Sequence, residues 1–367
     1  TDSHLWAKSY ERDLKDVLLL QRDIASDLGQ KISPSAGQQP LEKSGKPRQI
    51  DPAAHDAYLR GVYEWNKWDK GAQKAVEYFT AAIHLDPSYS NAHAGLANAY
   101  SHFGIMGIFP PEVAWPKAEA AALKTLELDD SSAEAHAALG YIKSRYYWEW
   151  ADAEAEFLRA IELNPNNATV HHWYGLLLAE EGRFDEGIRE TQRAQDLDPL
   201  SILISASVGR RFYLSRRYDQ AIAQFQRTLE MNPDFGLALS GLGAAYIQVH
   251  RYPEAIAVLE KAAKVAKDNP ESLPVLGFAY ALSGDHARAR AILSELQAQS
   301  KSHYVSPCFT AIIHAGMGET DKAVRDLQQA ARDRSNWMTL IGTEPIFDSL
   351  RSDPRFIKLL GKVGFPP

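Results

Sequence analysis

The fold of this chain is decided by the spacing within GLGAAYIQVHRYPEAIAVLEKAA, residues 241–263. Two of its small residues belong to series that recur every 34 residues along the sequence. The series are Gly175, Gly209, Gly243 and Gly277 with Ala311 next, and Ala153, Gly187, Ala221, Ala255, Ala289 and Ala323. Prolines 165, 199 and 233 keep the same interval. A small residue at a fixed place lets two helices approach closely, and a proline ends the second helix, so the period predicts stacked two-helix repeats.

The repeats also match a known consensus of Trp-x2-Leu-Gly-x2-Tyr, then Ala-x3-Phe, then Pro over 34 residues. One unit supplies Leu139-Gly140, Ala153, Phe157 and Pro165, and the other units meet the pattern in part. The chain therefore resembles the tetratricopeptide-repeat (TPR) family over residues 51–335. The resemblance implies an all-α fold, a right-handed α-solenoid of about eight helix pairs with a C-terminal capping helix.

Four segments follow from the patterning. Residues 1–32 read mainly as an amphipathic helix, residues 33–50 as a Ser-, Pro- and Gly-rich linker, residues 51–335 as the repeat array and residues 336–367 as a C-terminal cap. About nine extra residues interrupt the second unit near 105–111. This insertion and a cluster of tryptophans lie in the first half of the array, where we expect any specialised function.

The flanking segments narrow the resemblance. HLWAKSYERDLKDVLLLQRDIASDL (residues 4–28) resembles the end of the TolB-like module of certain bacterial signalling proteins, and FDSLRSDPRFIKLLGKVGF (residues 347–365) resembles their closing stretch. In that group the array follows CadC-type winged-helix regulators, adenylyl cyclases or serine/threonine kinases. The resemblance implies a regulatory segment that acts on an N-terminal head. Because the chain opens at Thr1 without a methionine, we expect it to be a fragment.

Composition limits the kinds of partner. A net charge of -7 and a pI near 6.0 argue against a nucleic-acid surface. No run of about 18 apolar residues occurs, so we expect no membrane contact by this segment. The single cysteine, Cys308, fits a reducing compartment. We expect a cytoplasmic location, or a periplasmic one if an upstream segment spans a membrane.

Sequence motifs for metal, cofactor or catalytic chemistry are weak. His93, His136 and His171 share one repeat position, but helices lie about 8–10 Å apart, so a packing role with hydrogen bonds is favoured over a shared metal. The dinucleotide-like GLGAAY at residues 241–246 follows no strand and falls inside a predicted helix. Cys308 falls within an apolar helix and reads as an inert thiol. We therefore predict no enzyme activity, no cofactor and no metal.

Charged clusters leave two interpretations open. Arg210, Arg211, Arg216 and Arg217 form a dense basic cluster that can hold carboxylates, or that is simply solvated. The acidic pair Glu180-Glu181 falls near a turn, where solvation or capping explains it.

In TPR proteins the first helix of each pair lines the concave groove. The turns that would face a ligand supply nine candidate binding residues: Tyr58, Asn98, Tyr141, Arg145, His172, Arg210, Tyr213, Gln248 and Phe278. Asn98 fits the carboxylate clamp of chaperone-binding TPRs, but Ala94 replaces its lysine, so we predict no chaperone-tail binding.

The sequence thus favours a non-enzymatic interaction scaffold. We expect its concave groove to bind a protein or peptide segment, acidic in character if the arginine cluster takes part, or another part of the parent chain. The alternative is a regulatory or sensory segment of a bacterial transcription regulator, cyclase or kinase that acts in cis.

Overall fold

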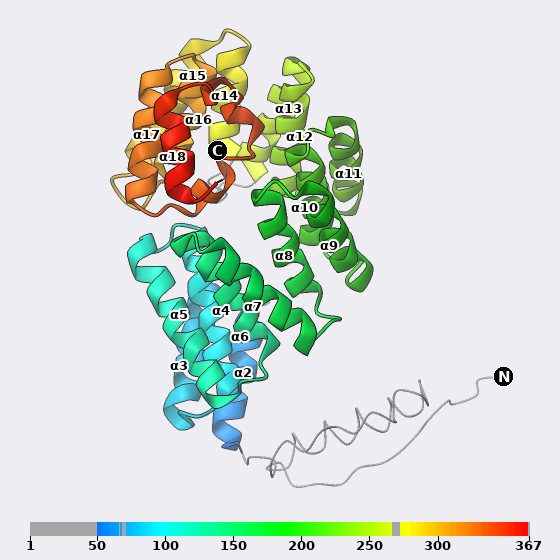
Figure 1. The fold of residues 1–367 in the computed structure, drawn as a ribbon, viewed down its shortest axis with the longest axis vertical. Coiled ribbons are helices and arrows are strands. Elements are labelled where there is room, and N and C mark those ends of the chain that lie inside the picture. Colours follow the sequence, from blue (N-terminus) through cyan, green and yellow to red (C-terminus); the bar gives the residue numbers. More distant parts are fainter. Residues whose placement is uncertain (1–49, 66, 68–70, 266–271, 366–367) are drawn as a thin grey trace, which may run out of the picture. The chain divides into compact units, whose positions relative to one another are not determined.

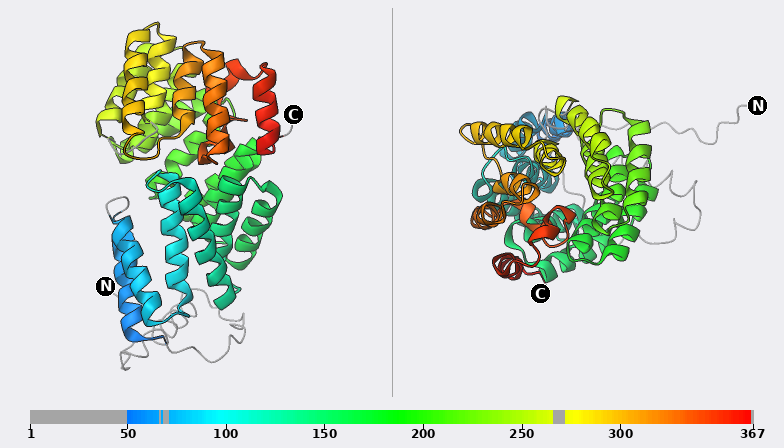
Figure 2. Two further views of the ribbon diagram at one scale, coloured as in Figure 1. Left: turned by 90° about the vertical axis from the view of Figure 1, so that its left-hand side faces the viewer. Right: turned by 90° about the horizontal axis from the view of Figure 1, so that it is seen from above.

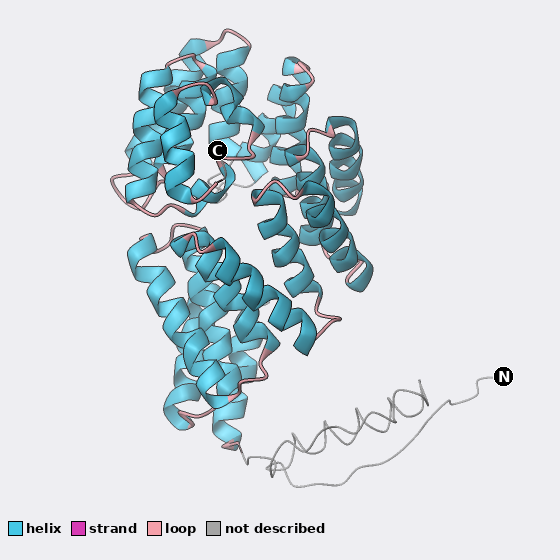
Figure 3. Ribbon diagram, viewed as in Figure 1, coloured by secondary structure: helices cyan, strands magenta, loops and turns pink. Residues whose placement is uncertain are grey.

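The computed structural model describes residues 50–65, 67, 71–265 and 272–365 (Figure 1). Within these ranges the chain is helical and contains no strand (Figure 3). The predicted N-terminal helix and all but the last residue of the predicted linker lie outside them. The chain divides into two compact units, residues 1–96 and residues 97–367.

The first unit is built around the helices α2 (Pro52–Trp65) and α3 (Ala72–Leu85) and the start of α4 (Ser90–Ile105). Phe79 of α3 is buried between two glycines, Gly61 and Gly95. A Cβ atom at Gly61 would lie 2.5 Å from the Phe79 ring, and one at Gly95 would lie 2.8 Å from it. The small residues of the repeat therefore make room for an aromatic side chain from the facing helix.

Helix pairs fill the second unit, as the 34-residue period predicts. Over the described residues the pairs that follow α2 and α3 are α4 with α5 (Pro111–Leu128), α6 (Ala133–Ile142) with α7 (Trp150–Leu163), α8 (Ala168–Glu180) with α9 (Phe184–Leu197), α10 (Ile202–Leu214) with α11 (Tyr218–Met231), α12 (Gly236–Gln248) with α13 (Tyr252–Val265), α14 (Ser272–Leu282) with α15 (His286–Gln299), and α16 (Pro307–Gly316) with α17 (Thr320–Arg332). The protein is thus an all-α solenoid with eight helix pairs in its described part.

Two departures from the regular repeat lie in the second and third pairs. The insertion forms the connection Met106–Pro110 and lengthens its neighbours, since α4 has 16 residues and α5 has 18, with Pro116 inside α5. In the third pair a π-helical turn, η4 (Lys143–Tyr147), follows α6 and ends at Trp148 in the left-handed region, φ 62°. The sequence did not predict this turn.

The C-terminal segment returns to earlier helix pairs of the second unit (Figure 2). It contains two 3-10 turns, η5 (Asn336–Leu340) and η6 (Pro345–Leu350), and the helix α18 (Pro354–Val363). Asp353 caps α18 by accepting a hydrogen bond from the Arg355 amide, and Phe356 is buried. The Trp150 indole of α7 donates to the Val363 carbonyl at 2.8 Å. The segment therefore contacts the third pair as well as the last one.

Candidate functional site

A cavity of about 220 Å³ opens between the first helices of successive pairs in the second unit. Its wall includes residues of α8, α10, α12 and α14 together with η5 of the C-terminal segment. Four of the nine predicted groove residues line it: Tyr141, Arg145, His172 and Arg210. The counting of repeat positions thus placed side chains from α6 to α10 around one space.

The other five predicted groove residues lie elsewhere. Tyr58 packs in the first unit, 5.1 Å from the Tyr89 ring by centroid distance. Asn98 and Gln248 are half-buried on α4 and α12. Phe278 is buried, and a Cβ atom at Gly316 would approach its ring to 2.6 Å. Tyr213 is fully buried and donates its hydroxyl proton to Glu344.

The carboxylate of Glu180 lies beside Arg145 in this region. Arg145 donates to Thr339 Oγ1 at 2.6 Å and forms an ion pair with Glu180 at 2.8 Å. Glu180 is 0% exposed, and this burial raises the pKa of its carboxyl to about 7, although Arg145 and Arg211 act in the opposite direction. The interpretation of Glu180 as a solvated turn residue is therefore wrong: it is the last residue of α8 and faces the interior.

Arg211 is the most deeply buried cation at the cavity, with 2% of its surface exposed. Burial lowers the pKa of its guanidinium to about 9, while Glu180 opposes this shift. His172 lies nearby with Nε2 2.8 Å from the Ser207 hydroxyl. Burial, with Arg211 and Arg145 adding to it, lowers the pKa of His172 to about 3, so its imidazole is neutral at pH 7.

Two other arginines of the cluster, Arg210 and Arg216, hold acidic residues of the C-terminal segment, whereas Arg217 pairs with Asp185 of α9. Glu344 is 0% exposed and accepts hydrogen bonds from Arg210 Nη2 at 2.5 Å and from the Tyr213 hydroxyl at 2.6 Å. Arg216 pairs with Asp348 at 2.8 Å. A purely solvated cluster does not describe these contacts. Arg210 and Arg216 thus already hold two carboxylates from more than 130 residues away along the chain.

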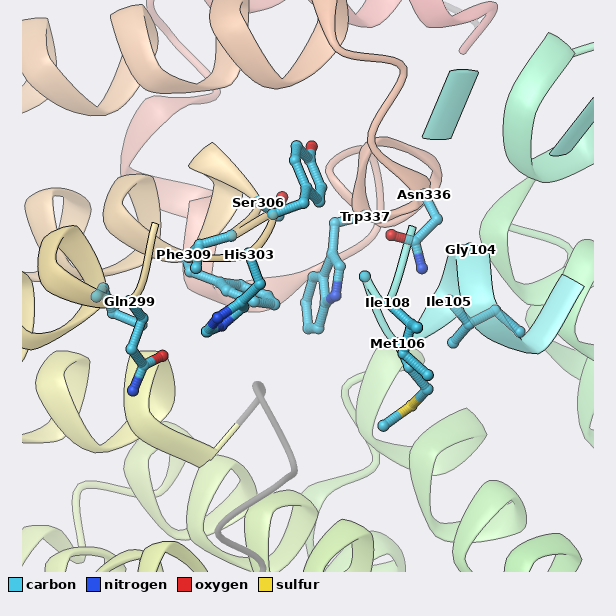
Figure 4. Close-up of a pocket in the computed structure, with 14 residues that line it drawn as sticks. Gly104, Ile105, Met106, Ile108, Gln299, His303, Ser306, Phe309, Asn336 and Trp337 are labelled. Atoms are coloured by element: carbon cyan, nitrogen blue, oxygen red, sulfur yellow. The ribbon is translucent and has the colours of Figure 1, made fainter. Parts of the chain in front are cut away.

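A second cavity, of about 360 Å³, lies where the insertion meets the connection between α15 and α16. Figure 4 shows Ile105, Met106 and Ile108 on one side of Trp337, with Gln299, His303 and Phe309 on the other. A Cβ atom at Gly107 would lie 3.1 Å from the Tyr304 carbonyl oxygen, so this contact is close. Cys308, next to this wall, is fully buried, and burial raises the pKa of its thiol to about 12.

The three histidines at the shared repeat position are hydrogen-bonded to glutamates of the neighbouring helix or to proline carbonyls of the preceding loop. His93 Nε2 lies 3.0 Å from the Pro87 carbonyl oxygen, and His136 Nδ1 lies 2.7 Å from Glu156. His171 contacts Glu190 through Nδ1 and the Pro165 carbonyl through Nε2. These contacts use the ring nitrogens for packing, as the spacing indicated.

Sequence reasoning missed Glu180 and Glu344, and it gave Arg211 no separate role. For Arg211 and Glu180 the repeat itself carried a signal. Leu177 and Ala245, one repeat away from Arg211 on either side, are buried, and so is Leu214, one repeat after Glu180. A charged residue in a core register was therefore visible in the sequence. For Glu344 no such signal exists, because it lies beyond the regular repeats.

Family models described as tetratricopeptide repeat match residues 156–189 and 212–273. These two stretches are tetratricopeptide repeats. A solved tetratricopeptide repeat protein from Parabacteroides merdae superposes with a TM-score of 0.51 at 13% identity, over 73% of this chain and 100% of that one. This TPR likeness shows the shared fold.

Two further solved structures are similar at lower scores. PilF of Pseudomonas aeruginosa gives a TM-score of 0.42 at 22% identity, over 57% of this chain and 94% of that one. YrrB, described as a TPR protein with an unusual peptide-binding site, gives 0.36 at 23% identity, over 54% of this chain and 97% of that one.

One curated relative is named as a cyclase. A Rhizobium meliloti protein named "Putative adenylate cyclase 3" is 27% identical in an alignment of 103 residues that covers 26% of this chain. The match spans 17% of that protein's length. In the described part of the TPR chain no helix combines the length and the apolar character needed to cross a bilayer.

Proposed function

We propose that this TPR array is a non-enzymatic scaffold that binds an acidic segment of a protein. The binding surface is the inner face of the second unit, by which we mean the side of the first helices that carries Arg210 and Tyr213. TPR folds serve as protein-interaction scaffolds, and a preformed groove spreads recognition over many modest contacts. The acidic preference rests on one observation: Arg210 and Tyr213 together hold the carboxylate of Glu344. We call the position of this carboxylate the Glu344 seat. A guanidinium and a phenol together offer donors suited to a carboxylate.

The C-terminal segment occupies this seat, so a partner's carboxylate must take the place of Glu344. Such an exchange costs little if one charge-assisted hydrogen-bonded pair replaces another of the same kind. A partner binds when its affinity for the opened groove exceeds the free energy that docks the segment. The segment thus sets a threshold for binding.

A peptide probe tests this proposal in the full chain. The probe is a fluorescein-labelled copy of residues 340–350, LIGTEPIFDSL, with a second copy carrying Gln in place of Glu344. We expect the Glu344→Ala chain to bind the acidic probe at least tenfold more tightly than the wild type does, measured by fluorescence anisotropy, because its own carboxylate no longer fills the seat. Glu162→Ala, which removes an exposed glutamate of α7, is the matched control. Equal binding of the Glu and Gln probes by the Glu344→Ala chain would overturn the acidic preference.

The cyclase match favours a second candidate, a regulatory segment that acts in cis on an attached head. The supporting observation is the 103-residue similarity to a protein whose name denotes a cyclase. The reading frame upstream of Thr1 should then encode a catalytic or DNA-binding head. In that longer protein, Glu344→Ala should change the head's output severalfold while Glu162→Ala leaves it unchanged. An upstream frame without such a head would eliminate this candidate.

A further inference from the structure

The 220 Å³ cavity of the second unit contains more positive than negative charge. Three guanidinium groups, those of Arg145, Arg210 and Arg211, lie at its wall. Two carboxylates, Glu180 and Glu344, are paired with Arg145 and Arg210. Among the described residues Arg211 is then the one guanidinium at this wall without an ion pair, and His172, which is neutral, does not add a charge.

Arg211 carries this excess charge. It is 2% exposed, and its Nε atom is fully enclosed and has no hydrogen-bond partner. Among the described residues none forms an ion pair with its guanidinium. Burying a guanidinium that has no ion-pair partner of its own is costly, even with the Glu180 carboxylate in the same region, so proteins rarely keep one without a use. The planar fork of arginine matches a carboxylate in a bidentate fashion.

The remaining wall defines the shape of a ligand. Polar groups of the same wall include Ser240, whose buried hydroxyl contacts the Ser272 hydroxyl, and Ser207, whose hydroxyl contacts His172. Apolar side chains complete the wall, and they come from α8, α10, α12, α14 and η5: Leu176, Leu203, Ala244, Val275, Trp337 and Leu340. At about 220 Å³ the space is smaller than pockets for drug-sized ligands, which start near ~300 Å³.

We propose that this cavity binds a small organic carboxylate, whose carboxylate pairs with Arg211 and whose apolar body packs between the inner helices. The site differs from the Glu344 seat: it lies at another arginine and takes a small molecule instead of a peptide segment. It does not depend on the acidic-segment proposal. Because η5 forms part of its wall, a bound ligand also contacts the C-terminal segment.

Benzoate is a suitable probe, and benzamide is its neutral isostere. We expect millimolar benzoate to raise the melting temperature of the full chain and to give a saturable isotherm by titration calorimetry, whereas benzamide does neither. Arg211→Met removes the charge and keeps an apolar stem, and it should weaken benzoate binding at least tenfold. Arg217→Met removes an exposed arginine of the same cluster, which pairs with Asp185, and should leave benzoate binding unchanged.

A second variant keeps the proposal testable if Arg211→Met fails to fold. Leu237 lines the cavity and is partly exposed, so Leu237→Trp can block the space without removing a charge. It should also abolish benzoate binding. The proposal fails if benzoate does not bind the wild type, or if Arg211→Met and Leu237→Trp bind it as the wild type does. Inorganic phosphate is tested in parallel, and binding of phosphate without benzoate would show that the ligand class is wrong.

Discussion

Gly175 of α8 and Gly187 of α9 face each other at the closest approach of their helix pair. A Cβ atom at Gly175 would lie 2.4 Å from Thr191 Oγ1 and 2.8 Å from the Gly187 carbonyl oxygen. A Cβ atom at Gly187 would lie 2.8 Å from the Gly175 carbonyl oxygen. Both 2.8 Å contacts are with backbone carbonyl oxygens, which cannot move aside as a side chain can.

Alanine at either glycine should therefore destabilise the second unit. We expect Gly175→Ala and Gly187→Ala each to lower the free energy of unfolding by about 1–3 kcal/mol, the usual cost of overpacking. Gly361→Ala is the matched control, because nothing lies within 4 Å of a Cβ atom there. In helix α18 it should gain about 0.5–1 kcal/mol from reduced chain entropy. Urea titrations of the three variants check the contrast, and equal effects at all three sites would contradict it.

The buried His172 should give the protein an acid-sensitive stability. Burial lowers its pKa from 6.5 to about 3, so between these values the unfolded chain binds a proton that the folded chain does not. Stability is therefore fully present above pH 6.5 and falls as the pH drops, by at most about 1.4 kcal/mol per pH unit. Glu180 acts oppositely, since its raised pKa of about 7 makes stability fall as the pH rises from 4.5.

Comparing a His172 variant with the wild type separates the pH dependence due to His172 from that due to Glu180. The free energy of unfolding of His172→Gln minus that of the wild type should rise as the pH falls from 7 to 5, because glutamine binds no proton. Chemical denaturation at several pH values measures this difference. His286→Gln, at an exposed histidine of α15, controls for the loss of an imidazole. A difference that stays constant with pH would show that His172 is not a source of the acid sensitivity.

At the scale of elements, α8 depends on the residue that begins it. Asn167 caps the helix by accepting hydrogen bonds from the amides of Thr169 and Val170. Replacing it with alanine should cost about 1 kcal/mol of stability, whereas Asn167→Ser should keep the cap without placing a second negative charge beside Glu134. Asn166→Ala, at the exposed neighbour, should change stability by less than about 0.5 kcal/mol. Thermal unfolding by circular dichroism ranks the three variants, and a loss with Asn166→Ala as large as with Asn167→Ala would argue against the cap.

The regular helix pairs could be predicted because each unit repeats the same pattern of local residues. Small residues, caps and prolines at a 34-residue interval determine where helices begin, end and approach. The π-helical turn at Lys143–Tyr147 could not be predicted in this way. It depends on how Arg145 reaches Thr339 and how Arg334 stacks over Trp148 at 4.1 Å, and these contacts join distant parts of the sequence.

The candidate site could be predicted only where its residues belong to the regular repeats. Counting repeat positions selected Tyr141, Arg145, His172 and Arg210, which line the cavity, because the inward turns of successive first helices share a face. The same counting could not find Glu344, which follows no period and is brought to Arg210 by the folding back of the C-terminal segment. Periodicity therefore predicts the surface of a solenoid but not what the chain places on it.

At the scale of the whole molecule, the second unit departs from the usual energetics of a repeat protein. In a simple solenoid each repeat contacts only its neighbours, so ends can unfold independently. Here the segment after α17 contacts Arg145 and Trp150 of the third pair and Arg210 of the fifth. Opening the eighth pair must then also break contacts with pairs far away along the chain, which couples their unfolding.

Cutting one of these connections should reduce that coupling. Trp150→Leu removes the hydrogen bond to the Val363 carbonyl and the ring contact with Phe365 at 5.4 Å. We expect its urea transition to broaden, with a lower m-value, and amide exchange to accelerate in η6 and α18 before it does in α8. Trp173→Leu makes the same chemical change on α8, where the indole packs on Tyr141, and should lower stability without broadening the transition. If the urea transitions of both variants stay as sharp as that of the wild type, the contacts of the C-terminal segment do not couple the pairs. Contacts between neighbouring repeats alone would then account for the cooperativity of unfolding.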